Sequence, residues 1–516
     1  MNGEFTVRKS VIALISSVLA VIYSICVILC SVLKYQNNDI LTGNVSGADK
    51  NASLFVSVSS NSSKEESTSN FEGSSESSDT ASSENTDNNP DLLPPDETEP
   101  VLPAVTEPSN DTVSKGDNGS SKVNDTSSSD NNTPAQPPKT VQSTFKSAVW
   151  YAYYELSFVG LNENQFKTKI DKMFNDAVDI GTTDVICHVR PFADAYYRSD
   201  YFPVSKYVSG TQGKDPGYDP LEYMVKSAHK RGLKIHAWIN PYRISNDDDI
   251  SKLSTDSPAY KWRNDNDSEK NRNVLSWGGK LYFNPGKAEV RKLIIDGVRE
   301  IVEKYDVDGV QIDDYFYPTA PAADENFDSV EYNEYKNSSG GNYLSLGDWR
   351  RANVSALVSG IYSAVHSARD GVVFGVSPAA GISSNYNNMY ADVASWVANK
   401  GYIDYIAPQL YFGYEYKLDS YKFINLLKQW LSLPRAEGVE IHIGLAAYKV
   451  GKENDAGSNE WITKNDILGR QVEDCFSYGC NGVILFSYST IMGKGELINA
   501  ERNSYISAVS SVRSRL

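Results

Sequence analysis

The stretch DVDGVQIDDYFYP, residues 306–318, sets the expectations for the rest of the chain. Side chains alternate between the two faces of a strand, so Gln311 and Asp313 point one way while Ile312 points the other. A polar residue and an acid thus share one face, and α/β proteins place catalytic groups at the carboxyl ends of such strands. We therefore expect Asp313 and Asp314 to belong to a functional site. The alternative is a buried structural acid followed by a turn or helix cap.

Strand-like and helix-like segments alternate on both sides of this stretch. Eight short runs are expected to be strands, at 147–154, 183–189, 234–239, 308–313, 372–377, 403–408, 440–446 and 482–487. Helical stretches lie between them, around 164–180, 219–232, 287–304, 348–369, 388–400, 420–432, 464–478 and 497–513. This alternation predicts a (β/α)8 barrel with enlarged loops after strand 3 (245–285) and strand 4 (318–347). A doubly wound open sheet is the alternative, although no glycine-rich phosphate loop follows the first strand.

The N-terminal part of the chain has a different character. Residues 11–33 are uncharged, mostly apolar and long enough to cross a bilayer as a helix. Basic residues before them predict that residues 1–10 are cytoplasmic, and a cleaved signal peptide is the alternative. Residues 34–142 are rich in Ser, Thr, Asn, Asp and Pro, which predicts a disordered linker. The barrel, expected over 143–516, would then lie outside the cell on a membrane tether.

Charge and cysteine content narrow the function classes. The chain has a formal net charge of −17, and residues 36–142 contain 18 acidic residues against 5 basic ones. The acidity therefore belongs mainly to the linker, and nucleic-acid binding is not indicated. Three cysteines, Cys187, Cys475 and Cys480, fall in the barrel region without metal-ligand spacing. We expect them to be small buried residues, and a local disulfide between the last two is the alternative.

Polar residues collect where the predicted strands end. The carboxyl ends of all barrel strands meet at one rim, so these side chains should converge there. Apart from the two aspartates they are Glu155, His188, Arg190, His236, Asn240, Gln409, Tyr411, Tyr448, Ser487 and Tyr488. Each alone is weak evidence, because an inward histidine is more often a hydrogen-bonded core residue than a ligand. Strands that merely packed would end in ordinary turn residues, so the set as a whole indicates a site.

Six motifs distributed over the chain carry a family resemblance. They are the segment 188–243, which begins HVRPFADAYY and ends HAWINPYR, then LYFNPGKAEVR (281–291), DVDGVQIDDYFYP, DWRRANV (348–354), VSP (376–378) and IDYIAPQLY (403–411). Together they resemble the glycosyl-hydrolase-like 10 family of bacterial barrel proteins, over about residues 145–510. The resemblance implies a cell-envelope glycosidase, similar to enzymes that cut peptidoglycan strands stripped of their peptides. By this likeness the site residues are Arg190, Asp194, His236, Asn240, Arg243, Asp313, Asp314, Gln409 and Tyr411.

Aromatic side chains are expected to provide sugar-stacking surfaces, since flat rings pack on the apolar faces of pyranoses. The candidates are Tyr315, Tyr317, Tyr411, Phe412, Trp238 and Trp277, although Trp238, assigned to the face opposite His236, could instead pack under a helix. Three sites depart from the family pattern. Val204 and Phe412 each replace a common Trp, and Ala379-Ala380 replace Phe-Gly. These departures affect the expected sugar platforms and leave the acids untouched.

Glycoside hydrolysis needs a carboxylic acid that protonates the leaving oxygen and a second carboxylate that acts as nucleophile or base. We expect Asp313 to be the nucleophile or base. The acid is expected to be Glu155, whose aromatic neighbours would raise its pKa, with Asp314 or Glu415 as alternatives. His236 and Asn240 are expected to bind hydroxyls or hold a carboxylate. No metal or cofactor is expected.

The arginines of the set have two possible roles. Arg190 and Arg243 could pair with the acids or with a carboxylate on the substrate, or they could close the barrel top with salt bridges. The whole reading is a monomeric, single-pass membrane protein whose extracellular barrel hydrolyses a cell-wall glycan. Two other classes remain: a wall-binding protein without turnover, and a metal-dependent deacetylase or amidase built on His188, His236 and Asp313.

Overall fold

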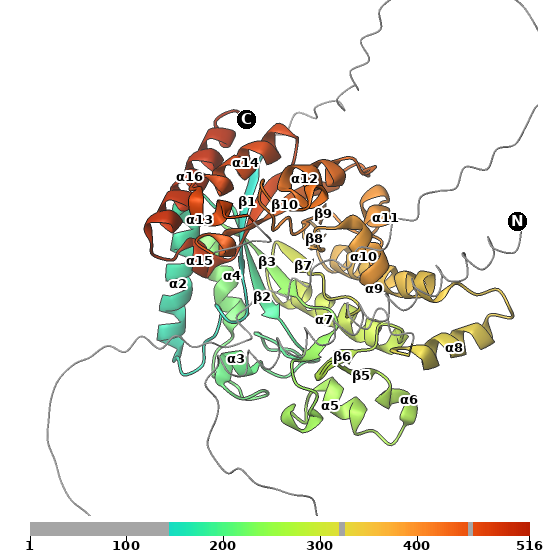
Figure 1. Ribbon diagram of the computed structural model, residues 1–516. Coiled ribbons are helices and arrows are strands. Elements are labelled where there is room, and N and C mark those ends of the chain that lie inside the picture. The colour runs from blue at the N-terminus through green and yellow to red at the C-terminus, as the bar shows by residue number, and fades with distance from the viewer. Residues whose placement is uncertain (1–143, 319–325, 453–457) are drawn as a thin grey trace, which may run out of the picture. The chain divides into compact units, whose positions relative to one another are not determined.

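Eight parallel strands close into a barrel in the computed structural model, which describes residues 144–318, 326–452 and 458–516 (Figure 1). In chain order the barrel strands are β1 (Lys146–Tyr151), β2 (Asp184–Arg190), β3 (Lys234–Ile239), β7 (Gly309–Ile312), β8 (Val373–Val376), β9 (Tyr405–Ile406), β10 (Glu440–Ala446) and β11 (Gly482–Phe486). Around the barrel their order is β1-β11-β10-β9-β8-β7-β3-β2, and β1 closes it by pairing with both β11 and β2. The barrel prediction is confirmed, and the doubly wound alternative is wrong.

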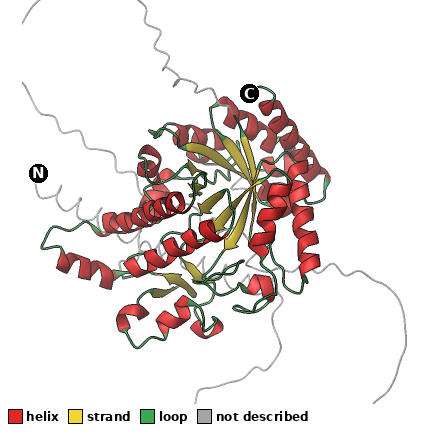
Figure 2. Ribbon diagram, turned by 180° about the vertical axis from the view of Figure 1, so that it is seen from behind, coloured by secondary structure: helices red, strands yellow, loops and turns green. Residues whose placement is uncertain are grey.

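Helices cover the outside of the barrel, as Figure 2 shows from behind. The eight helices that follow the strands are α2 (Glu163–Asp179), α4 (Pro220–Lys230), α7 (Ala288–Lys304), α9 (Leu346–Ala368), α11 (Val393–Ala398), α12 (Phe423–Leu431), α14 (Ile467–Ser477) and α16 (Glu496–Arg513). Local signals set their starts. Asn162 and Gln165 form a capping box at α2, and Asp219 caps α4 just before Pro220.

One predicted helix differs in the structure. The stretch 388–400 was expected to be helical, but α10 (Ile382–Asn388) ends where it should begin and α11 starts only at Val393. Between them Tyr390 adopts a left-handed backbone conformation with φ of 54°, which a helix cannot contain. Its hydroxyl accepts a hydrogen bond from Nη1 of Arg350 at 3.0 Å, so a tertiary contact overrides the local helical pattern.

The enlarged loops after the third and fourth barrel strands contain structure of their own. After β3, the strands β4 (Arg243–Ser245), β5 (Val274–Trp277) and β6 (Lys280–Phe283) form an antiparallel sheet in the order β4-β6-β5. After β7 comes α8 (Ser329–Ser338), and residues 319–325 before it lie outside the described part. The remaining short elements are α3 (Lys206–Ser209), η2 (Ile250–Lys252), α5 (Pro258–Arg263), α6 (Ser268–Asn271), η4 (Asp419–Tyr421), η5 (Ala447–Lys449), α13 (Glu460–Thr463) and α15 (Tyr488–Ile491).

The predicted N-terminal segments cannot be compared with the structure. The cytoplasmic stretch 1–10, the anchor 11–33 and the linker 34–142 all lie outside the described residues. Within the described part, no helix combines the length and the apolar character needed to cross a membrane. The domain limits therefore stay predictions.

Glycines on the inner face of the barrel make room for large rings from the neighbouring strand. A Cβ atom at Gly309 would lie 2.4 Å from the ring of His236, its direct partner on β3. A Cβ atom at Gly375 would lie 2.1 Å from the ring of Tyr405. These distances are far inside van der Waals contact, so only glycine allows the interior to be filled by rings at these levels.

The amino-terminal ends of the strands share a hydrogen-bonding device. A side-chain oxygen just before one strand accepts from the backbone N–H of the second residue of the neighbouring strand, which helps to fix the register of the pair. The acceptor and donor residues are Asp308 with Ile235, Asp404 with Phe374 and Asn481 with Ile441, at 2.9, 2.7 and 3.0 Å. Each satisfies a buried backbone donor that would otherwise lack a partner.

A buried polar network fills the same end of the barrel. His236 contacts Oδ1 of Asp184 through Nε2 at 3.3 Å and the hydroxyl of Tyr405 through Nδ1 at 3.0 Å. The ring of Tyr405 stacks on His442, which contacts Glu440 at 2.9 Å. Burial alone would raise the pKa of Asp184, but the hydrogen bond and charge of His236 outweigh burial and hold that pKa at about 2.

We expect Asp184→Asn to lower the free energy of unfolding at pH 7 by about 2 kcal/mol, because the folded protein then loses an acid whose pKa is depressed. This stabilisation is present above the ordinary aspartate pKa near 4 and is lost as pH falls through about 2. Urea unfolding of both proteins at pH 7 and near pH 2.5 measures it. The control Asp306→Asn removes an exposed acid and should change little. Equal curves for Asp184→Asn and the parent at pH 7 would contradict the prediction.

Candidate active site

Two adjacent carboxylates stand at the carboxyl end of β7. Asp313 is buried, with 2% of its surface exposed, and Asp314 is half-buried. The indole Nε1 of Trp238 donates to Oδ2 of Asp313 at 2.9 Å, whereas Oδ1 has no hydrogen-bond partner among the described residues. Gln311 is the strand partner of Trp238 and accepts from Trp150 at 3.2 Å inside the barrel. Asp313 therefore lies on the inner face, as the strand alternation predicts.

The environment moves both carboxyl groups away from their ordinary titration range. Burial first, and then the charge of Asp314, raise the pKa of Asp313 to about 8, against the opposing effects of the Trp238 N–H and the Arg243 charge. Burial raises the pKa of Asp314 to about 6, and Gln409 and Arg243 oppose the rise. Near neutral pH the pair of carboxyls therefore holds one proton.

Arg243 supplies positive charge beside the pair. Its guanidinium lies 4.5 Å from the centroid of the Tyr315 ring and 4.6 Å from that of Phe192, which are cation–π distances. Nη2 donates to Asn246 at 3.3 Å, and the backbone N–H of Arg243 donates to Oδ1 of Asn240 at 3.1 Å. Asn240 thus shapes the turn that delivers the arginine, and its predicted contact with substrate stays a prediction.

Gln409 and two aromatic residues lie beyond the end of β9. Nε2 of Gln409 donates to the backbone oxygen of Ser377 at 3.2 Å, and the same side chain lies beside Asp314. Tyr411 stacks on Phe486 with ring centroids 5.6 Å apart. Phe412 is half-buried, and the ammonium of Lys449 lies 5.2 Å from its ring. Gln409 is therefore adjacent to the carboxylate pair, while the aromatic pair belongs to neighbouring ring clusters.

Arg190 was expected at the rim but points away from it. The register between β2 and β3 shifts between His188 and Arg190, which places Arg190 beside Ile239 instead of on the inner face. The guanidinium lies 4.6 Å from the ring of Phe202, and a Cβ atom on Gly297 of α7 would lie 2.8 Å from Nη1. Arg190 therefore packs between the barrel and α7, which corrects the prediction that it lines the site.

His236 and Tyr317 are also placed elsewhere. His236 pairs with Gly309, four residues before Asp313 along β7, which at about 3.3 Å per residue is roughly 13 Å. It belongs to the network at the amino-terminal end, not to the carboxyl rim. Tyr317 is 2% exposed, and the guanidinium of Arg350 lies 5.3 Å from its ring. A buried ring covered by a cation cannot serve as a sugar platform in this conformation.

Asp194 connects loops next to the rim. Its Oδ2 accepts from Nε2 of Gln212 at 3.4 Å, while Oε1 of Gln212 accepts from the backbone of Ser254 at 2.8 Å. Burial raises the pKa of Asp194 to about 6, and hydrogen bonding to Ser205 opposes the rise. These contacts tie the loop after β2 to the insertion after β3, so the role the structure gives Asp194 is to hold that wall.

Glu155 braces the junction between the first and last strands. Oε1 accepts from the hydroxyl of Ser487 at 2.7 Å and from the backbone N–H of Ser489 at 2.6 Å, and Oε2 accepts from the backbone N–H of Ala152 at 2.8 Å. Burial raises the pKa of this carboxyl, and these donors oppose the rise. Both oxygens are occupied as acceptors, which suits an anchoring carboxylate. The alternative acid Glu415 is exposed and faces Lys464 at 3.9 Å.

Trp238 was misplaced at the sequence level. The assignment to the face opposite His236 is wrong, because residues two apart share a face of a strand, and both side chains point inward. The ring of His188 stacks on the indole with centroids 3.8 Å apart and an angle of 7° between the planes. The alternation rule, applied strictly, would have found this pair above the histidine network.

The histidines do not form a metal centre with the acids. His188 stacks beside the carboxylate pair and His236 lies at the other end of the barrel. No three His, Cys, Asp or Glu residues of the described part come together as possible ligands. Cys187, Cys475 and Cys480 are buried thiols, as expected, and no disulfide joins Cys475 to Cys480.

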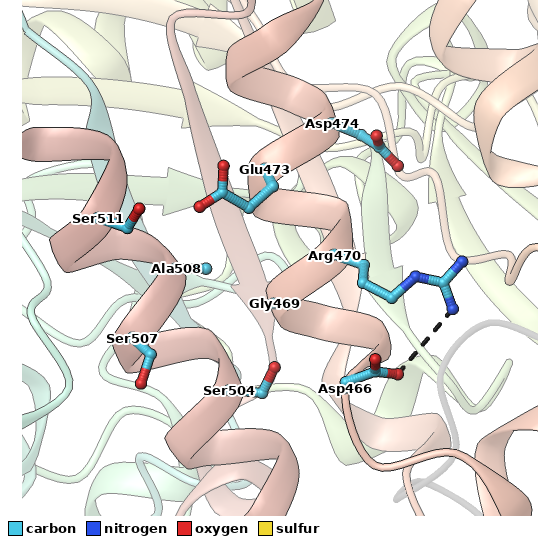
Figure 3. Close-up of a pocket in the computed structure, with 9 residues that line it drawn as sticks. All are labelled: Asp466, Gly469, Arg470, Glu473, Asp474, Ser504, Ser507, Ala508 and Ser511. Carbon is cyan, nitrogen blue, oxygen red and sulfur yellow. Dashed lines mark ion pairs between the residues drawn. The ribbon is translucent and has the colours of Figure 1, made fainter. Parts of the chain in front are cut away.

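A cavity of about 500 Å³ opens on the helical shell between α14 and α16 (Figure 3). Its walls include the charged residues Glu473, Asp474 and Arg470, the last facing Asp466 at 3.9 Å. None of the predicted site residues lines it. The cavity is therefore separate from the carboxylate pair, which lies inside the barrel.

The structure is a closed parallel (β/α)8 barrel with two adjacent carboxyls at the carboxyl ends of its strands, the face where barrel enzymes place their active sites. The chain belongs to the glycosyl hydrolase-like 10 family, which matches residues 144–463.

Proteins similar to this chain carry related names. It is 38% identical to "Glycosyl hydrolase YngK" of Bacillus subtilis over 61% of this chain, and the alignment spans 62% of that relative. It is 30% identical to "Glycosyl hydrolase DigH" of Escherichia coli K12, over 74% of this chain and 90% of the relative. Among solved structures, the catalytic domain of β-amylase from Paenibacillus polymyxa has a TM-score of 0.47 and 12% identity, covering 71% of this chain and 99% of that one.

We expect Glu155→Gln to lower the melting temperature, with a loss of about 1–3 kcal/mol, because glutamine has one acceptor oxygen and its amide nitrogen cannot accept from the donors on its side, either Ser487 and Ser489 or Ala152. The folded fraction should keep its ability to cleave glycan. Thermal unfolding and cleavage assays on the same sample measure both quantities. An unchanged melting temperature together with abolished cleavage would instead make Glu155 the acid that the sequence suggested.

Proposed function

We propose that this chain is a glycoside hydrolase in which Asp313 donates the proton and Asp314 is the ionised partner. The observation that carries the proposal is the pair itself: two adjacent carboxyls whose pKa values are about 8 and about 6. Environments that push two titratable groups apart assign one as acid and the other as base or nucleophile. This exchanges the role that the sequence suggested for Asp313.

The local groups support this division of labour. Trp238 binds only one oxygen of Asp313, and the other oxygen is buried without a hydrogen-bond partner among the described residues, so no protein group there competes for its proton. The half-buried position of Asp314, beside Gln409, makes it the more accessible member. The positive charge of Arg243 stabilises the ionised form of both carboxyls and so opposes the rise in their pKa values. Its effect is smaller than that of burial, so both pKa values stay raised.

The proposed substrate is a cell-wall glycan, with peptidoglycan strands first. Its support is the motif resemblance, together with membership of a glycosyl hydrolase-like family and relatives named glycosyl hydrolases. Arg243, enclosed by rings beside the acids, suits a substrate that carries a carboxylate substituent. The membrane anchor over residues 11–33, the extracellular location and the monomeric state belong to the same proposal and rest on the sequence alone.

We expect the whole chain to release new reducing ends from purified peptidoglycan or from the same glycan freed of its peptides. Asp313→Asn should lower the rate at least about a hundredfold, since it removes general acid catalysis. Fragment masses and reducing-end assays measure this. The matched control is Asp184→Asn, the same change at the opposite end of the barrel, which should retain cleavage.

The outcomes separate the function classes. Released acetate or amine would indicate the deacetylase or amidase alternative. Retention of the protein on the glycan without any product, in parent and control alike, would turn the conclusion to a wall-binding protein.

The pH dependence of kcat/KM should be bell-shaped, with limbs near pH 6 and pH 8. Below about 6 the rate falls because Asp314 takes up a proton, and above about 8 it falls because Asp313 loses its own. Initial rates between pH 4.5 and 9.5 at constant ionic strength test this. An acid limb near 4 with no alkaline limb would mean that neither carboxyl is held in a low-dielectric site.

A further inference from the structure

Trp238 lies between the stacked ring of His188 and the carboxyl of Asp313. The N–H at the edge of its indole donates to Oδ2 at 2.9 Å, and the His188 ring stacks on the indole face with ring centroids 3.8 Å apart. An indole nitrogen can only donate a hydrogen bond. Oδ2 therefore acts as the acceptor in this contact, whether the carboxyl is ionised or protonated.

A protonated carboxyl has one carbonyl oxygen and one hydroxyl oxygen. The carbonyl oxygen of a protonated carboxyl is the stronger acceptor, so the Trp238 N–H favours the form with the carbonyl at Oδ2 and the hydrogen on Oδ1, the buried oxygen that has no partner in the described part of the chain. We propose that Trp238 is a positioning residue that fixes the transferable proton on Oδ1 of Asp313, and that His188 holds the indole in the orientation this requires. The proposal rests on the proposed function and deepens it.

His188 is suited to holding the indole. It is 3% exposed, neither ring nitrogen has a partner among the described residues, and Tyr153 meets it edge-on with centroids 5.7 Å apart. Burial, followed by the charge of Arg243, lowers the pKa of His188 well below its usual value. The imidazole is therefore neutral, and stacking brings no second cation toward the pair.

The groups that act directly on Asp313 are Asp314 and the backbone N–H of Tyr315 after β7, Arg243 on β4 and Trp238 on β3, and the Tyr315 hydroxyl lies near the same carboxyl. His188 on β2 and Tyr153 after β1 lie behind the indole. Of the side chains among them, only the indole donates directly to this carboxyl. Removing its N–H should therefore change the proton affinity of Asp313 without altering the charges around it.

In the acid step, the proton leaves Oδ1 for the glycosidic oxygen. The bond from that oxygen to the anomeric carbon breaks, and its electron pair stays on the leaving oxygen. Oδ2 keeps its hydrogen bond throughout, and the bond strengthens as the carboxylate forms. The indole thus stabilises the product state of the proton transfer.

The experiment uses the whole chain labelled with ¹⁵N at tryptophan, titrated by NMR between pH 5 and 9.5. Trp238→Phe assigns the Trp238 indole signal, which should shift with a midpoint near 8 in the parent and stop titrating in Asp313→Asn. Trp150→Phe assigns the control, a second buried indole whose N–H donates to Gln311 at 3.2 Å. The Trp150 signal should not titrate with the same midpoint. A Trp238 signal that stays still in the parent would overturn the proposal without any substrate being needed.

The second arm follows the alkaline limb of kcat/KM. Trp238→Phe should raise its midpoint by about one pH unit and lower kcat roughly tenfold, since one hydrogen bond to a charged acceptor is lost. His188→Phe keeps a stacking ring and should leave the midpoint in place, whereas His188→Ala should shift it upward. Trp150→Phe should not move it. Equal shifts in Trp238→Phe and Trp150→Phe would overturn the proposal.

The two arms keep this proposal apart from the proposed function. Cleavage that depends on Asp313, with no titration of the Trp238 signal, would leave the glycosidase standing and remove the positioning role. A Trp238 signal that titrates, with no cleavage of either glycan, would keep the hydrogen bond between Trp238 and the Asp313 carboxyl and remove the glycosidase function.

Discussion

Placing two neighbouring carboxyls in a barrel interior constrains everything around them. Desolvation and mutual repulsion oppose the charged form, so the pair cannot carry two negative charges cheaply. The structure meets this with one indole donor, one arginine held at a distance between rings, and a shared proton. A closer salt bridge would have stabilised the charges but removed the proton that acid catalysis needs. The function proposed for the site therefore requires that Trp238 and Arg243 stabilise the negative charge only in part.

The two ends of the barrel treat acids in opposite ways. At the amino-terminal end the pKa of Asp184 is depressed to about 2, so its contribution to stability is lost as pH falls. At the carboxyl end the pKa of Asp313 is raised to about 8, so stability is present below its ordinary pKa near 4 and is lost as pH rises through 8. Opposite slopes place the most stable range between these limits. The barrel is braced at one end and carries a destabilising functional site at the other.

The sequence predicted the barrel because every strand is a short apolar run followed by a helical stretch. Only the helix at 388–400 was predicted wrongly, because Tyr390 interrupts it and contacts Arg350. It also predicted that Asp313, Asp314 and Gln409 lie together, and they do: the two acids follow β7 directly, and Gln409, three residues after β9, lies beside Asp314. It could not place Arg190, because a one-residue register shift is not visible in the residue pattern. Tyr317 depended on packing against Arg350, a residue of α9. The errors at Arg190 and Tyr317 thus come from packing that the residue pattern does not show, whereas the errors at Trp238 and His236 come from strand geometry that was applied incompletely.

The inner glycines have a consequence for how related sequences can diverge. Gly309 faces His236 and Gly375 faces Tyr405 on adjacent strands, and no side chain fits at either glycine while the ring is present. Neither member of a pair can change size alone without a void or a collision. On steric grounds, a larger residue at either glycine therefore requires a smaller partner on the neighbouring strand. In related sequences we therefore expect the residues at positions 309 and 236, and those at 375 and 405, to vary together in size.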